Sequence, residues 1–226
     1  MVHSQAITQA MYEMAQQEKK LTQADIKILC ETLKKDAELS HQSLHKLQDL
    51  CNRLQNKELV SWDQFFRVLS DQELIRYLQL DQELQVEGEV ASKEAVLTRI
   101  LHFLKYKEDK LNLSSLHIKA LPSCIFLFGE LKELNCSHNL LTALPKETKY
   151  CRCLEKLDLS HTGIQSLPDL SSCADLSSID LSSTPFSDTY ELRILASQLG
   201  KGEATELIGY IHKKAAAPSK EKRWGV

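Results

Sequence analysis

Proline and glycine are scarce in the first part of this chain. The first 121 residues contain no proline and one glycine, Gly88. Four of the five prolines fall between residues 122 and 185. Because both residue types interrupt regular helices, this uneven distribution predicts a change of architecture between the two halves of the chain.

Long hydrophobic runs and a strong charge of one sign are also missing. The longest strongly apolar stretch, Cys124 to Phe128, is far too short to span a bilayer, and the start MVHSQAITQAM has no apolar signal core. A formal net charge of −3 provides no overall field for nucleic acid. The seven cysteines favour reduced thiols. We therefore expect a cytoplasmic protein without nucleic-acid partners or membrane insertion.

Helical periodicity dominates residues 1–107. Apolar residues recur at helical spacing in six blocks, which predicts an N-terminal helical domain that packs as a bundle. N-cap residues and capping boxes support these starts, because their side chains can satisfy the free N–H groups of a first turn. The candidates are Ser4, Thr22, the pair Ser61 and Gln64, and the pair Ser70 and Glu73.

Two features of this helical part allow a sharper interpretation. His41 and His45 have the spacing of a zinc-binding pair on one helical face, but no third ligand accompanies them, so we expect a solvated or partly buried histidine pair. Trp62, Phe65 and Phe66 could form a docking surface, yet aromatic residues at helical spacing usually fill a core.

The C-terminal half repeats itself. Rows that start at Leu111, Leu134, Leu157 and Ile179 align as LNLSSLHIKALP, LNCSHNLLTALP, LDLSHTGIQSLP and IDLSSTPFSDTY. A repeat of about 23 residues indicates a solenoid. Residues 131–145 carry almost the complete pattern LxxLxLxxNxLxxLP, and residues 154–168 carry it well. This segment resembles the leucine-rich repeat superfamily.

The resemblance implies about four repeats over residues 108–187. In the family the asparagine of the pattern, Asn139 here, satisfies backbone groups inside the turn. The other rows depart from the pattern and carry Leu116, Thr162 and Thr184 at that position, so a continuous asparagine ladder is not expected.

Helices are expected at both ends of the repeats, because a repeat stack exposes apolar surface there. The helix Ser92 to Lys107 would cover the front coil, and residues 188–214 would form a helical C-terminal cap. Residues 215–226 would form a flexible basic tail. The predicted fold class is α+β, with an N-terminal helical bundle followed by a short leucine-rich repeat solenoid and a helical cap.

The repeat register assigns three cysteines to the core. Cys136, Cys151 and Cys173 are expected to point inward as small apolar residues. Cys173 and Asp175 resemble the Cys-x-Asp motif of bacterial ubiquitin ligases, but we favour the buried interpretation, because a reactive thiolate needs an exposed, electropositive site.

The strand face of the repeats is the candidate binding surface. It is predicted to be polar, small and slightly acidic, with His138 near His161 and Asp158 near Asp180 on neighbouring strands. No catalytic residue, metal ligand or cofactor is assigned. The predicted partner-binding residues are Asn112, Glu133, Asn135, Ser137, His138, Lys156, Asp158, Ser160, His161 and Asp180.

These patterns favour a monomeric protein-protein interaction module that binds another protein through the repeat face and the adjoining helices. It would be an adaptor or, given its similarity to bacterial leucine-rich-repeat effectors, a secreted effector in a host cytosol. The alternative is an enzyme with an unrecognised cysteine-dependent site, such as a ubiquitin-ligase-like activity. That site would use a cysteine that the repeat register does not bury: Cys30, Cys51, Cys124 or Cys153.

Overall fold

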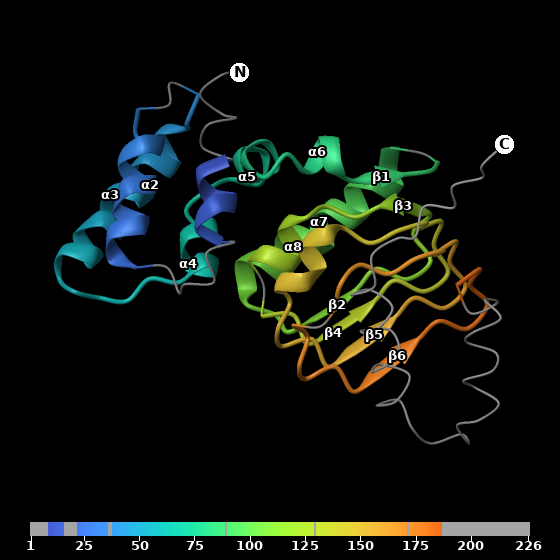
Figure 1. The fold of residues 1–226 in the computed structure, drawn as a ribbon. Coiled ribbons are helices and arrows are strands. Elements are labelled where there is room, and N and C mark those ends of the chain that lie inside the picture. Colours follow the sequence, from blue (N-terminus) through green and yellow to red (C-terminus); the bar gives the residue numbers. More distant parts are fainter. Residues whose placement is uncertain are drawn as a thin grey trace, which may run out of the picture.

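The computed structural model describes residues 9–15, 22–35, 38–88, 90–128, 130–170 and 172–186. Helices fill the N-terminal part and a parallel sheet runs through the repeats (Figure 1), so the mixed α+β class is confirmed. The predicted C-terminal cap (188–214) and basic tail (215–226) lie outside the described residues. Residues 9–15 are helical and precede α2 (Gln23–Leu33), α3 (His41–Gln55), α4 (Trp62–Phe66), α5 (Asp71–Tyr77), α6 (Leu80–Glu83) and α7 (Val90–Tyr106).

The predicted caps at Thr22, Ser61 and Ser70 are confirmed, whereas Ser4 lies outside the described residues. Thr22 caps α2, and both capping boxes, at the starts of α4 and α5, are formed. Two short elements were not predicted. The helix α6 follows Gln79, whose φ of 52° is left-handed, and β1 (Gln85–Val86) pairs antiparallel with β3 (Ile118–Ala120).

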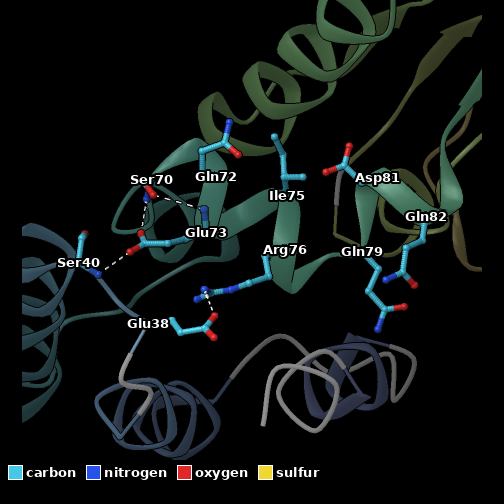
Figure 2. A pocket seen from close by; sticks show the side chains of 10 residues that line it. All are labelled: Glu38, Ser40, Ser70, Gln72, Glu73, Ile75, Arg76, Gln79, Asp81 and Gln82. Atoms are coloured by element: carbon cyan, nitrogen blue, oxygen red, sulfur yellow. Dashed lines mark hydrogen bonds and ion pairs between the residues drawn. The ribbon is translucent and has the colours of Figure 1, made fainter. Parts of the chain in front are cut away.

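Glu73 joins two of these helices (Figure 2). Its carboxylate accepts from the N–H groups of Ser40 and Ser70, at 2.8 and 2.7 Å, and from the hydroxyl of Ser43 at 2.6 Å. Burial acts to raise the pKa of this carboxyl, but the hydrogen bonds from the three serines outweigh it and lower the pKa to about 2. A single ionised side chain therefore fixes the start of α3 against the start of α5.

The repeats form a four-stranded parallel sheet in the order β2 (Lys110–Asn112), β4 (Glu133–Asn135), β5 (Lys156–Asp158) and β6 (Ser178–Asp180). The four leading residues of the predicted rows, Leu111, Leu134, Leu157 and Ile179, are register partners in adjacent strands. The short helices α8 (Cys124–Leu127) and η1 (Lys146–Tyr150) lie in the outer parts of the coils and contact each other. Every coil thus contributes one strand, as its spacing predicts.

Asn139 connects the first two coils. Its amide nitrogen donates to the carbonyls of Leu113 and Cys136 at 2.7 and 2.9 Å, and its oxygen accepts from the N–H groups of Leu116 and Ile118. The residues at the same position in later coils, Thr162 and Thr184, each donate to the carbonyl three residues earlier at 2.6 Å. The asparagine therefore bridges coils, whereas the threonine hydroxyls stabilise their own turn.

An aromatic cluster joins the helical part to the repeats. The ring of Phe128 lies 4.7 Å from Trp62 and 5.3 Å from Phe66, between centroids. Phe65 and Phe66 are fully buried, so these aromatics fill a core, as expected. One continuous set of buried side chains runs through both parts.

The helix α7 covers the first coil. It contacts β2, and the guanidinium of Arg99 donates to the carbonyl of Asn112 at 3.0 Å. The helix extends from Val90 to Tyr106, close to the predicted span. The apolar front edge of the repeats is thereby covered by the chain itself.

Candidate partner-binding face

The strand face is built from columns of equivalent residues. The sheet register pairs Asn112 with Asn135, Asn135 with Asp158, and Asp158 with Asp180. The predicted approach of the two aspartates is therefore present. Because every strand belongs to the same parallel ladder, each column places four side chains at a spacing of about 4.8 Å.

This column also shapes the turn that follows each strand. The Oδ1 atom of Asn135 accepts from the hydroxyl and the N–H of Ser137, at 2.7 and 2.9 Å. Asp158 holds Ser160 in the same way, at 2.7 and 3.0 Å. Ser137 and Ser160 are only 6% and 7% exposed, which corrects their prediction as contact residues. Their hydroxyls are turned toward the preceding side chain and stabilise the turn.

The two predicted histidines extend from the face. The rings of His138 and His161 are stacked, with centroids 4.3 Å apart and planes 9° apart, and both side chains are exposed. Each residue follows a buried serine and has a left-handed backbone, with φ of 55° and 54°. Ser115 and Ser183, in the neighbouring coils, have φ of 56°. This conformation directs the side chains outward at the edge of the sheet.

A ladder of charges borders the other side of the face. The carboxylate of Glu133 lies 3.0 Å from the ammonium of Lys156 and 3.3 Å from that of Lys110. Hydrogen bonds from these two lysines lower the pKa of Glu133. The Lys156 and Lys110 side chains are 59% and 65% exposed. Both therefore remain accessible while they pair with Glu133.

The ten predicted contact residues therefore separate into two groups. Ser137 and Ser160 are buried, and Asn135 and Asp158 are half-buried acceptors within turns. The others offer accessible side-chain atoms in a single band across the strands. The exposed or half-buried members of this band are Asn112, Glu133, His138, Lys156, His161 and Asp180.

The cysteines lie mostly in the core. Cys136, Cys151 and Cys173 are buried as predicted, and burial raises the pKa of Cys151 to about 12 and that of Cys173 to about 11. Cys30 and Cys124, which the repeat register left unassigned, are buried as well. Packing between α2 and α3 covers Cys30, and α8 turns Cys124 inward. The cysteine-dependent enzyme hypothesis is left with half-buried Cys51 and exposed Cys153.

The other candidate sites have fewer features of a binding or catalytic site. His41 and His45 are exposed on α3, and the described part of the chain holds no group of three or more potential metal ligands. A hollow of about 680 Å³ lies beside α5 (Figure 2). Its charged groups are compensated by the protein: Arg76 pairs with Glu38 and Asp81 with Lys93. In the described ranges we find no helix that is both long and apolar enough to cross a bilayer.

Comparison with known proteins agrees with this geometry. The family model for leucine-rich repeats in two copies matches residues 129–172. Residues 129–172 of the chain are therefore leucine-rich repeats. Leucine-rich repeats are in general interaction modules that bind other proteins, and the matched segment contains β4, β5 and the stacked histidines.

Two known proteins are similar to this chain over part of their own length. Toll-like receptor 10 of Bos taurus is 27% identical over 194 residues, which cover 80% of this chain and 23% of the receptor. The solved structure of YopM, a leucine-rich effector protein from Yersinia pestis, is 20% identical, with a TM-score of 0.35, and covers 51% of this chain and 36% of that chain. The chain thus spans less than two thirds of either protein.

Proposed function

We propose that this leucine-rich repeat chain is a protein-binding module whose contact surface is the strand face together with the adjoining surface of α7. In this proposal the N-terminal helices form a bundle that caps a short solenoid. The chain acts as an adaptor or an effector and has no enzymatic role of its own. The observation that supports this proposal most is the band of exposed side chains that the strand register aligns, with the stacked pair His138 and His161 at one edge.

Charge and exposure support this choice of surface. The band is polar, and the carboxylate of Glu133 lies beside the ammonium groups of Lys110 and Lys156, so a partner that covers Glu133 does not bury an unpaired carboxylate and meets one excess positive charge. The imidazole rings add flat, amphipathic area at the edge of the same surface. Exposed histidine and lysine side chains are suitable for recognising a partner by hydrogen bonds and ring contacts.

The size of the face explains why the helices belong to the surface. Four strands at about 4.8 Å spacing span only about 15 Å, which is narrow for a standard interface of about 800 Å² per partner. The helix α7 contacts β2, so it lies next to the first strand. We infer that a partner contacts both.

A comparative pull-down tests the proposal. The double variant H138A/H161A removes the exposed ring stack, and H41A/H45A removes two exposed histidines from α3 as a matched control. We expect the first variant to lose proteins that the wild type and the control both retain. Equal retention by all three chains would move the binding site away from the strand face.

A further inference from the structure

Two thiols face each other between α2 and α3. Cys30 on α2 is buried and Cys51 on α3 is half-buried, and after burial itself the neighbouring Cys51 contributes to the raised pKa of Cys30. Both are free thiols. The pair lies in the helical part and is independent of the proposed binding face.

The hydrogen bonds between the two helices support this placement. The ammonium of Lys34 donates to the side chain of Gln48 at 2.8 Å, and the amide of Gln23 donates to the carbonyl of Glu58 at 3.1 Å. The end of α2 therefore lies near the middle of α3, and its start near the residues after α3, so the helices are antiparallel. Lys34 bonds to Gln48. One helical turn before Lys34 is Cys30, and one turn after Gln48 is Cys51, so in antiparallel helices the two cysteines lie at the same level.

A groove gives small molecules access to this level. It has a volume of about 280 Å³, and its wall includes Cys51, Lys27, Lys34 and Glu31. The two ammonium groups outnumber the carboxylate, so the wall of the groove carries a net positive charge. Of the two, Cys51 is therefore the thiol that an oxidant in solution reaches first, because Cys30 is buried.

We propose that Cys30 and Cys51 form a reversible disulfide that links α2 to α3 when a hydroperoxide oxidises the chain. The Cys51 thiolate attacks one oxygen of hydrogen peroxide, the O–O bond breaks, and Cys51 becomes a sulfenic acid while the second oxygen leaves as hydroxide, which takes up the proton that the Cys51 thiol had released and becomes water. The Cys30 sulfur then attacks the Cys51 sulfur, the S–O bond breaks, and a second water leaves with the Cys30 proton. Two thiols are oxidised while one peroxide is reduced to two waters.

The test uses the full chain with Cys153→Ser, because this exposed thiol could link two chains. Six thiols remain of the seven. After hydrogen peroxide treatment, denaturation and alkylation, we expect four labelled cysteines and one peptide pair joined through Cys30 and Cys51. Dithiothreitol should restore six. A peptide map of the unchanged chain provides the same readout without depending on the folding of a variant.

Two further variants separate the steps. In C153S/C30S, we expect Cys51 to be trapped as a sulfenic acid by a cyclic 1,3-dione. In C153S/C51S, Cys30 should remain a thiol after the same treatment, with circular dichroism confirming that the fold is unchanged. Cys51 oxidised to sulfinic acid beside an alkylatable Cys30 in the C153S chain would overturn the proposal, as would a disulfide that joins Cys51 to another cysteine.

Discussion

The imidazole rings of His138 and His161 lie face to face, 4.3 Å apart between centroids and 9° from parallel. They occupy the same position in successive coils, and both have a left-handed backbone. The stack is therefore a direct consequence of coil-to-coil register. The same register aligns the exposed residues of the proposed binding band.

A substitution at the second histidine tests this backbone conformation. His161 has φ of 54°, where a β-branched residue is strained and asparagine is tolerated. We expect His161→Val to lower the free energy of unfolding by about 2 kcal/mol, and His161→Asn to change it by less than about 0.5 kcal/mol. Urea denaturation measures both. Equal stabilities for the two variants would contradict the left-handed assignment.

Asn139 should contribute strongly to the free energy of unfolding. It is 4% exposed, and its amide satisfies backbone groups of two coils. Because Asn139→Ala leaves several buried groups without a hydrogen bond, we expect a loss of about 3 kcal/mol in urea denaturation. The control Asn52→Ala changes an exposed side chain on α3 and should shift stability by about 0.5 kcal/mol or less. Similar losses for both would rule out the bridging role.

Glu73 should make stability depend on pH in an acidic range. Its folded-state pKa of about 2 lies below the unfolded value, so its contribution is fully present above the unfolded pKa. That contribution, on the order of 3 kcal/mol, is lost as the pH falls from about 4.5 through 2. Glu73→Gln should therefore be less stable than wild type at pH 7 and should lose less stability on acidification.

Urea denaturation at several pH values between 7 and 2 measures this difference. The control Glu94→Gln alters an exposed carboxyl of α7 and should retain the pH dependence of the wild type. If Glu73→Gln instead follows the wild-type curve at every pH, the carboxylate does not stabilise the contact between α3 and α5.

The aromatic cluster should couple the helical part to the repeats. Phe128→Ala removes the ring that contacts Trp62 and Phe66, and we expect it to cost about 3 kcal/mol and to broaden or split a single unfolding transition. Leu59→Ala is the control, because Leu59 is 86% exposed. Circular dichroism during urea titration records both. An unchanged, single transition for Phe128→Ala would show that the two parts do not depend on this contact.

The repeat register could be predicted because leucine spacing encodes it directly. Leu134 and Leu157 define the strand, and their offset defines the coil. The burial of Ser137 and Ser160 could not be predicted from that pattern, because it depends on a hydrogen bond to the side chain two residues earlier. The sequence alone does not indicate whether a serine that follows a strand turns its hydroxyl toward solvent or toward the preceding side chain.

Short elements were missed for a different reason. The strand β1 has two residues, too few to show alternation, and its partner β3 lies within the first repeat row. The helix α6 has four residues and follows a left-handed Gln79, a conformation without a propensity signal for this residue type. The burial of Cys124 follows from helical winding in α8, which buries three consecutive residues, Cys124, Ile125 and Phe126.

The most direct test of the proposed function is site-specific photo-crosslinking from two lysine positions. A photoreactive residue at Lys156 lies on the strand face, and one at Lys146 lies on the outer side; their side chains are 59% and 88% exposed. We predict that irradiation in cell extract gives defined protein adducts from position 156 and not from position 146. The same adducts from both positions, or adducts from position 146 alone, would contradict recognition through the strand face.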